Sequence, residues 1–308
     1  MKDFLRIIDH SPETLRHMID RAADIKRDLK KGIMHHPLRD KIVALVFEKP
    51  SLRTRVSFQA GITQLGGESL FIHGSEVGLG ERESAADFAR VMSQYVDAIV
   101  MRVFDHRTVA EVAKFATVPV INGLSNTSHP CQAMADILTI QESFGSYERK
   151  KVVFIGDGNN VALSLAVLCG KLGMQFILSC PEGYGFPKDF EETYASSVDG
   201  AIPHEIRDPM EAASMADVLY TDVWTSMGQE KEREIRLEKF KRYQINEEMI
   251  KKAPLHVRVM HCLPAHRGEE ITDGVIESPV SLVFQQAGNR MHAQKAILEW
   301  LFTEEKVY

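Results

Sequence analysis

Short continuous apolar runs alternate with amphipathic segments along most of this chain of 308 residues. Apolar runs of four to eight residues are typical of buried strands, whereas apolar residues at spacings of three and four are typical of helices. The predicted strands cover residues 42–47, 68–72, 98–102, 118–122, 151–156, 175–179, 217–222 and 257–261. Helical segments fall between most of them. The alternation predicts an α/β fold with parallel sheets joined by right-handed crossovers.

A polar break at residues 142–150 divides the predicted strands into two sets of about four. The pattern therefore predicts two doubly wound parallel-sheet domains of similar size. We expect a first domain over residues 1–145, a second over 146–285, and a C-terminal helix over 286–308 that packs back on the first domain.

Two local signals refine this picture. Ser11-Pro12-Glu13 is typical of a helix start, with serine as the cap and proline in the first turn. Residues 74–80 contain three glycines and predict a mobile loop.

The composition excludes several classes of protein. With 44% hydrophobic and 26% charged residues, the chain is an ordinary globular protein. A net charge of −6 argues against binding to nucleic acid or to an anionic membrane. No apolar run reaches 18 residues, and the N-terminus lacks the apolar stretch of a signal peptide. Four cysteines without C-x-x-C spacing favour a reducing cytoplasm over a disulfide scaffold.

The segment Phe47–Phe58 carries the strongest chemical signal. It follows the apolar run 42–46 and enters a helical pattern, with two arginines and three hydroxyl residues within seven positions. Helix-start N–H groups, hydroxyl donors and guanidinium groups together predict an anion site. The nucleotide P-loop pattern is absent, so the phosphate would belong to another kind of molecule. The alternative is a charged helix start on the surface.

Further polar residues follow the predicted strands of the first half. Arg102 ends one strand, where ligands bind in open α/β sheets, although a surface arginine is the alternative. His129 and Gln132 lie three residues apart at the start of a helix, so both can face one ligand carrying a carbonyl and an amide. A helix cap with a solvated histidine is the alternative. Cys131 between them is better explained as a packed small residue than as a nucleophile.

In the second half, residues 156–160 read Gly-Asp-Gly-Asn-Asn after a predicted strand. The segment is similar to a dinucleotide fingerprint, but Val161 stands where the third glycine would be. Two asparagines at a helix start suit a small polar ligand better than a nucleotide.

Two more strands of the second half end in polar residues. Asp222 would offer a carboxylate to a cationic group, and residues 227–230 could form a hinged lid. The charged stretch 230–241 that follows is usually a solvated helix face. Cys262 could serve as a base or proton relay. His261 and His266 lack the spacing of a metal-ligand pair, which disfavours a metal site.

Arg290, near the start of the last helical run, is another anion contact or a residue of a capped helix.

Taken together, these segments resemble the aspartate/ornithine carbamoyltransferase family, and within it the ornithine-specific type. The match runs in order over essentially the whole chain. It includes residues 47–58, 83–102, 129–136, 156–160, 222–230, 261–270 and 289–295. The ornithine type is indicated by Asp222 with Ser226-Met227-Gly228 and by His261-Cys262-Leu263-Pro264. A carboxylate at position 222 has the wrong sign for the acid substrate of the aspartate type.

The resemblance implies transfer of a carbamoyl group from carbamoyl phosphate to the δ-amine of L-ornithine, giving L-citrulline and phosphate in arginine metabolism. It implies an active site in the cleft between the two domains. The residues implied to bind carbamoyl phosphate are Ser51, Leu52, Arg53, Thr54, Arg102, His129, Gln132, Leu263 and Arg290. Those implied to bind ornithine are Asn160, Asp222, Ser226 and Met227. The implied catalytic residues are Arg102, His129, Asp222 and Cys262.

The resemblance also implies that no metal, flavin or nicotinamide is required. It implies a cytoplasmic homotrimer, or a multiple of trimers, in which the 74–84 loop reaches toward a neighbour's site. One departure from the family pattern is Leu52, where relatives usually carry threonine. The backbone N–H of Leu52 can still meet phosphate, but a side-chain hydroxyl is lost. Leu163 stands where relatives often carry a polar residue.

Three other readings stay open at this point. A sister carbamoyltransferase would use putrescine or N-acylated ornithine, which the Ser226-Met227-Gly228 segment argues against. A catalytically silent paralogue would bind small ligands or a partner chain without turnover. A nicotinamide dehydrogenase is disfavoured by the incomplete glycine pattern.

Overall fold

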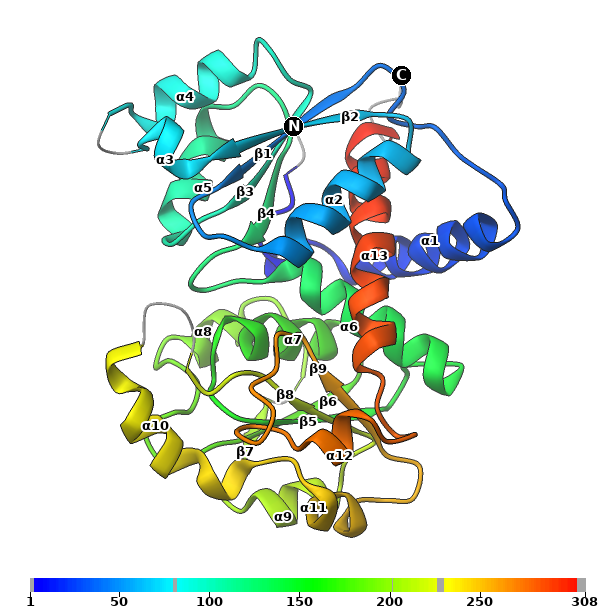
Figure 1. Ribbon diagram of the computed structural model, residues 1–308, viewed down its shortest axis with the longest axis vertical. Coiled ribbons are helices and arrows are strands. Elements are labelled where there is room, and N and C mark those ends of the chain that lie inside the picture. The colour runs from blue at the N-terminus through cyan, green and yellow to red at the C-terminus, as the bar shows by residue number, and fades with distance from the viewer. Residues whose placement is uncertain (1–2, 80–81, 201, 226–229, 304–308) are drawn as a thin grey trace. The chain divides into compact units, whose positions relative to one another are not determined.

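A computed structural model describes residues 3–79, 82–200, 202–225 and 230–303. The chain forms two compact units, of which the first runs to Leu138 and resumes at Asn289, and the second comprises Thr139–Gly288. Each unit is built around its own parallel sheet with helices on its faces (Figure 1). The predicted fold class, α/β with two doubly wound parallel sheets, is confirmed.

Unit 1 contains a four-stranded sheet in the order β2-β1-β3-β4, with every pair parallel. Its strands are β1 (Ile42–Phe47), β2 (Glu68–His73), β3 (Ala98–Arg102) and β4 (Val120–Leu124). Its helices are η1 (Ile7–Asp9), α1 (Pro12–Lys30), α2 (Leu52–Gln64), α3 (Gly74–Val77), α4 (Ala85–Met92) and α5 (His106–Phe115), together with the first part of α6 (Pro130–Phe144) and the greater part of α13 (Val283–Thr303).

Unit 2 contains a five-stranded parallel sheet in the order β7-β6-β5-β8-β9. Its strands are β5 (Lys151–Ile155), β6 (Gln175–Ser179), β7 (His204–Glu205), β8 (Val218–Thr221) and β9 (Arg258–His261). Its helices are α7 (Asn160–Lys171), α8 (Phe190–Ala195), α9 (Pro209–Ala213), η2 (Glu230–Glu232), α10 (Arg233–Phe240), η3 (Lys241–Tyr243), α11 (Glu247–Lys252) and α12 (Asp273–Ile276).

Both sheets reverse their winding direction at an inner strand. In unit 1 the chain passes from β1 to β2 on one side and then places β3 on the other side of β1. In unit 2, β6 and β7 lie on one side of β5, whereas β8 and β9 lie on the other. The carboxyl ends of β1 and β3, and those of β5 and β8, therefore flank topological switch points, where open α/β sheets bind ligands.

The apolar runs form strands because both faces of the inner strands are covered. Residues 43–46 of β1 are fully buried, as a parallel strand between two helical layers requires. The cap predicted for the first helix is also present, because Ser11 Oγ accepts a hydrogen bond of 3.2 Å from Thr14 N–H and Pro12 opens α1.

Two local expectations were wrong, and one short strand was not predicted. β4 begins at Val120 rather than at residue 118, because Pro119 has no N–H to donate to a ladder. β7 was not predicted, since its two exposed residues are too few and too polar to give a strand signal. Gly74–Val77, expected as loop, forms the short helix α3, which ends at Gly78 in the left-handed conformation at φ 61°.

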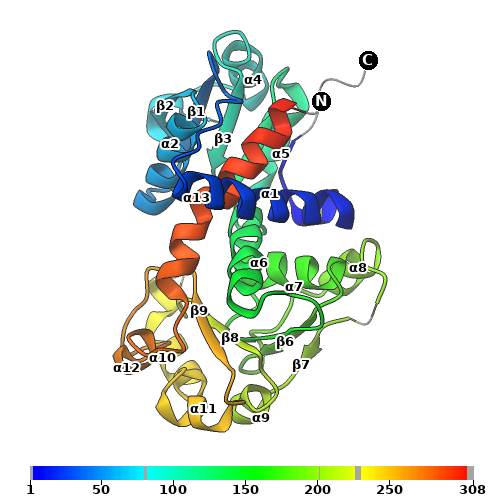
Figure 2. The same cartoon turned by 90° about the vertical axis from the view of Figure 1, so that its right-hand side faces the viewer.

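From Asn289 onward, α13 lies beside α1 and α2 of unit 1 (Figures 1 and 2). Arg21 pairs with Glu299 at 2.9 Å, and Lys295 Nζ donates to Gln64 Oε1 at 2.9 Å. These long-range bonds fix the helix on the first unit. In the part of the chain that the structure describes, no helix has both the length and the apolar character needed to cross a membrane.

The turn between α6 and β5 offers a matched test of backbone strain. Arg149 adopts φ 58°, a conformation that costs a side-chain-bearing residue roughly 1–2 kcal/mol. Arg149→Gly is therefore expected to stabilise the protein by up to about 1 kcal/mol, since the more flexible unfolded chain offsets part of the gain. Gly145→Ala, at φ 76° with no atom within 4 Å of the added Cβ, is expected to destabilise. Urea unfolding of both variants checks the opposite signs, and a decrease for Arg149→Gly would contradict the strain argument.

Candidate active site

The predicted anion segment of unit 1 lies at the carboxyl end of β1 and opens α2. Ser51 is the N-cap of α2, and its Oγ accepts from Thr54 N–H at 3.4 Å while donating to Thr54 Oγ1 at 2.9 Å. Arg53 is half-buried in the first turn. Leu52, the first residue of the helix, is 75% exposed, so its side chain is free of the core and its backbone N–H belongs to the helix start.

Arg290 of α13 joins this segment from the far end of the chain. Its Nη2 donates a hydrogen bond of 2.7 Å to the buried Thr54 Oγ1. The same oxygen accepts from Ser51, so the hydroxyl residues and a guanidinium form one connected network. Thr54 and Arg290 are 236 residues apart in the sequence, so no local sequence pattern could predict this contact.

His129 is buried close to two arginines. Burial lowers the pKa of His129 well below its usual value, and the positive charges of Arg290 and Arg102 lower it further. Arg102 itself is buried at the carboxyl end of β3. At neutral pH the imidazole of His129 is therefore neutral, so one ring nitrogen donates a hydrogen bond and the other can accept one. Such a site favours an anionic or strongly polarised oxygen.

The pKa of His129 predicts how stability depends on pH. In the unfolded chain His129 takes up a proton below pH ~6.5, whereas the native imidazole resists protonation, so stability is lost as pH falls through that value. The urea midpoint of the wild type should therefore drop more between about pH 7.5 and 5.5 than that of His129→Gln, by the equivalent of about 1 kcal/mol. The exposed His17→Gln is the control. Equal drops in wild type and His129→Gln would show that native His129 titrates normally.

Gln132 lies one turn into α6 from His129. Its Nε2 donates to Asp136 Oδ1 at 2.8 Å, which fixes the orientation of the carboxamide. Its Oε1 is buried and accepts no hydrogen bond among the described residues, so it can accept from an amide N–H of a ligand. Cys131 is fully buried, and burial raises its pKa to about 12. Its thiol donates to Asn122 O at 3.6 Å, which fits a packed residue rather than a nucleophile.

The second cluster lies in unit 2, at the carboxyl ends of β8 and β9. Thr221 and His261 are paired in register, so Asp222 and Cys262, which follow them, come to lie side by side. Cys262 Sγ donates to Asp222 Oδ1 at 2.9 Å, and Val223 N–H donates to the same oxygen at 2.8 Å. Asp222 is 9% exposed, so its carboxylate lies in a largely desolvated setting.

The turn after β5 contributes the asparagines. Asn160 is the first residue of α7 and is half-buried, whereas Asn159 is the helix cap. Asn159 was not among the predicted site residues, whereas Asn160 was. It is Asn159 that donates from Nδ2 to Asp222 Oδ2, at 2.9 Å. Ser226 and Met227 lie outside the described residues.

His261 and Leu263 shape the segment around Cys262. His261 Nδ1 accepts from Leu263 N–H at 2.9 Å, so its other nitrogen carries the proton and donates to Glu270 Oε1 at 3.0 Å. Both ring nitrogens are thus occupied, which leaves at most Asp222 and Cys262 of this group for a cation. Leu263 adopts φ 57° and precedes a cis peptide bond to Pro264.

Arg236 corrects one reading of the sequence. The stretch 230–241 was expected to be a solvated helix face, but Arg236 is 5% exposed. Its Nη1 donates to Asp157 Oδ2 at 2.6 Å and to Trp224 O at 3.0 Å, and its Nε to Glu232 Oε2 at 3.0 Å. Arg236 therefore ties together the residues on both sides of 226–229. Nothing in the charged sequence distinguishes this arginine from its neighbours.

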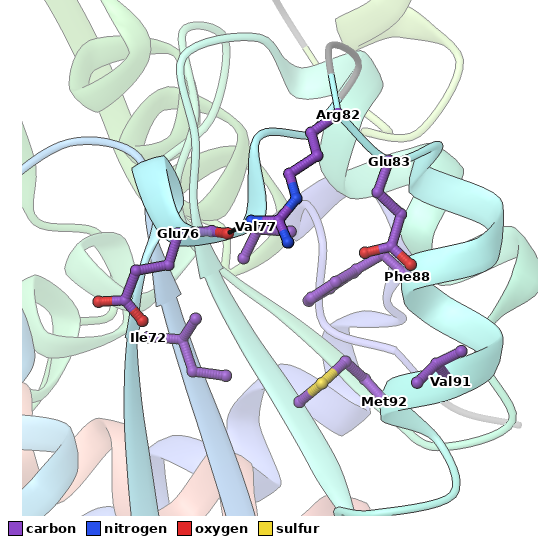
Figure 3. Close-up of a pocket in the computed structure, with 8 residues that line it drawn as sticks. All are labelled: Ile72, Glu76, Val77, Arg82, Glu83, Phe88, Val91 and Met92. Carbon is purple, nitrogen blue, oxygen red and sulfur yellow. Dashed lines mark hydrogen bonds between the residues drawn. The ribbon is translucent and has the colours of Figure 1, made fainter.

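A cavity of about 460 Å³ in unit 1 lies apart from these clusters. Figure 3 shows it between β2, α3 and α4, with Ile72, Phe88 and Met92 among its apolar lining residues. Arg82 crosses its edge and donates to Glu76 O at 3.3 Å. None of the predicted site residues lines this cavity.

Comparison with known proteins follows the same division of the chain. Residues 2–142 match the family model described as aspartate/ornithine carbamoyltransferase, carbamoyl-P binding domain. Residues 148–301 match the model described as aspartate/ornithine carbamoyltransferase, Asp/Orn binding domain. The chain belongs to the aspartate/ornithine carbamoyltransferase family. The part matched to the Asp/Orn binding domain therefore contains Asp222, Cys262 and the turn after β5 that carries Asn159.

Individual relatives of this family support the ornithine type. An ornithine carbamoyltransferase of Anoxybacillus flavithermus is 47% identical over 300 residues, covering 96% of this chain and 95% of the relative. A solved ornithine carbamoyltransferase of Pyrococcus furiosus is 48% identical with a TM-score of 0.92, covering 96% of each chain. A curated relative from the same organism is named "Ornithine carbamoyltransferase, anabolic" and is 48% identical, covering 96% of this chain and 95% of the relative.

Proposed function

We propose that this chain transfers the carbamoyl group of carbamoyl phosphate to the δ-amine of L-ornithine, giving L-citrulline and phosphate. The observation that carries the proposal is the buried carboxylate of Asp222 beside Cys262, in the unit matched to the amino-acid-binding domain. A carboxylate there suits a cationic amino acid and repels a second acid group such as that of aspartate.

Unit 1 would hold the donor substrate. The start of α2 would bind the phosphate through Ser51, the backbone of Leu52, Arg53 and Thr54, with Arg102 as a further cation. His129, neutral at neutral pH, and Arg102 would donate to the carbonyl oxygen as it becomes an oxyanion. Donors of this kind are worth roughly 3 kcal/mol each in a transition state.

The carbamoyl amide would be held by acceptors and by one further cation. Buried Gln132 Oε1 is oriented by Asp136 to receive an amide N–H, and Arg290 reaches the same network through Thr54. The backbone carbonyl of Leu263 in unit 2 is proposed as the second amide acceptor.

Unit 2 would hold ornithine through Asn160, Asp222, Ser226 and Met227. The attacking amine has a lysine-like pKa of ~10.4, so only about one molecule in 2,500 is neutral at pH 7. Asp222 and Cys262 would orient this amine and accept its proton. Its nitrogen then bonds to the carbamoyl carbon, the bond from that carbon to the phosphate oxygen breaks, and phosphate leaves with the bonding pair.

The reaction would use no metal, flavin or nicotinamide. We propose a cytoplasmic homotrimer, or a multiple of it, that acts in arginine biosynthesis. Light scattering on the purified protein would test the assembly, with an expected mass of three times the 34.7 kDa of the chain.

The activity is tested by measuring citrulline formation from carbamoyl phosphate and L-ornithine, with putrescine, N-acetylornithine and aspartate in parallel. Turnover with ornithine alone is the expected result. Turnover only with another amine would leave the proposed use of carbamoyl phosphate intact. It would overturn the proposal that unit 2 binds ornithine. Binding of both substrates without turnover would favour a silent paralogue.

A further inference from the structure

We infer that Asn159 is a positioning residue for the acceptor substrate, because it fixes the orientation of the Asp222 carboxylate. The inference rests on the proposed function, which it deepens by adding a residue that does not itself have to touch ornithine. The contact bridges the switch point of the second sheet, since Asn159 follows β5 and Asp222 follows β8.

The hydrogen bonds to Asp222 show why one more donor matters. Val223 N–H and Cys262 Sγ both donate to Oδ1. With these two alone, the carboxylate would be restrained at only one oxygen against rotation about the Cβ–Cγ bond. Among the described residues, Asn159 Nδ2 is the donor to Oδ2, at 2.9 Å, so it restrains the second oxygen and further opposes rotation of the carboxylate. A cationic amine then meets acceptor lone pairs in one direction only.

The orientation of Asn159 is itself determined by α7. Its Oδ1 accepts from Val161 N–H at 3.0 Å and from Ala162 N–H at 3.1 Å, as a helix cap does. Rotating the amide by 180° would place its NH₂ against two N–H donors and its oxygen against a carboxylate. The hydrogen-bond network therefore allows only the orientation that donates to Asp222.

The turn that carries Asn159 is held closely in place. Gly158 N–H donates to Tyr184 O at 2.9 Å, and a Cβ at Gly158 would lie 2.5 Å from Gly185 O. Asn159 N–H donates to Asp157 O at 2.7 Å, and the Asp157 side chain is bound by Arg236. Because the backbone cannot shift easily, the cap side chain has a defined reach to Asp222.

Two substitutions separate this role from helix capping. Asn159→Ser keeps an oxygen that can cap α7 but lacks the amide that reaches Asp222. We expect the KM for ornithine to rise roughly ten- to hundredfold, the effect of losing one hydrogen bond to a charged group. The KM for carbamoyl phosphate should stay within about twofold, because unit 1 is unchanged. Asn246→Ser is the matched control, since Asn246 caps α11 through Met249 N–H.

Asn159→Asp supplies a readout that a structural role would not change. It keeps the cap oxygen but places a second carboxylate against Asp222, and like charges raise the pKa of one member of such a pair. As pH falls, one shared proton restores a donor to Asp222. The ratio of the variant's ornithine KM to the wild-type KM should therefore decrease from about pH 9 to about pH 6. Among the described residues, the other titratable groups nearby are Cys262 and His261, which lie beside Asp222, and Asp157, Arg236 and Glu232. Dividing by the wild-type KM cancels their effects.

The experiment is a kinetic comparison of the four proteins in the full-length form, with thermal midpoints measured alongside. An active wild type with an unchanged ornithine KM in Asn159→Ser would overturn the positioning role while leaving the proposed function intact. The positioning role would also be overturned if Asn159→Ser raised the KM for ornithine and for carbamoyl phosphate equally. A KM ratio for Asn159→Asp that does not change with pH would overturn it as well. A wild type that produces no citrulline would overturn both proposals.

Discussion

Arg102→Met is expected to lower kcat for citrulline formation by roughly 10²–10³-fold, the usual effect of removing one preorganised donor to an oxyanion. Methionine replaces the buried aliphatic part of the side chain at the end of β3 but carries no positive charge. The stabilisation is lost mainly where negative charge develops in the transition state, so kcat should fall more than the KM for ornithine rises. Initial rates at saturating substrate concentrations provide the measurement.

Arg107→Met is the matched control for this prediction. Arg107 belongs to the same unit, but its side chain is 91% exposed and pairs with Asp105 on the surface. Its loss should leave kcat within about twofold, because exposed ion pairs contribute little. Arg102→Met should also raise the pKa of His129 toward its usual value, since Arg102 is one of two charges that lower it. A kcat for Arg102→Met within threefold of wild type would refute the proposed role.

The apolar runs predicted the strands well because inner strands of a parallel sheet are buried on both faces. Residues 42–47 and 98–102 match β1 and β3 at both ends. The pattern fails where a strand is not defined by burial. β7 forms at the sheet edge, where His204 and Glu205 are exposed and only the ladder to β6 makes them a strand.

The sequence could predict the position of a candidate site residue where a strand ends in a single charged residue. Arg102 and Asp222 are of this kind, and the structure places both at carboxyl ends of strands near switch points. The sequence could not decide which of two adjacent asparagines faces Asp222. That depends on which one caps the helix, and a shift of one residue rotates the side chain by about 100° around α7.

Contacts between residues far apart in the chain also could not be predicted from the sequence. The bond from Arg290 to Thr54 and the bonds from Arg236 to Asp157 and Trp224 join elements far apart in the chain. Arg236 lies among many charged residues, so neither periodicity nor charge indicates that it is buried. Such partners are fixed by the packing of the whole unit rather than by local pattern.

Asp222→Asn is expected to lower kcat/KM for ornithine by roughly 10²–10³-fold, because removing a buried charge that pairs with a ligand cation costs several kcal/mol. The substitution keeps the size and shape of the side chain but removes its negative charge and replaces one acceptor oxygen by an NH₂ donor. Both carboxylate oxygens accept hydrogen bonds, one from Val223 and Cys262 and the other from Asn159. Whichever way the new amide turns, its NH₂ faces a donor, so the substitution also disrupts the local network.

Asp217→Asn is the control for this last prediction. Asp217 precedes the other end of the same strand, β8, where it accepts from Lys151 N–H at 2.8 Å. Asparagine can keep that bond, so ornithine kinetics should be unchanged even if stability falls slightly. Binding of carbamoyl phosphate, measured calorimetrically, should be unaffected in both variants because its proposed phosphate ligands belong to unit 1. An Asp222→Asn variant with wild-type kcat/KM would remove Asp222 from the acceptor site and, with it, the reason for expecting a cationic substrate.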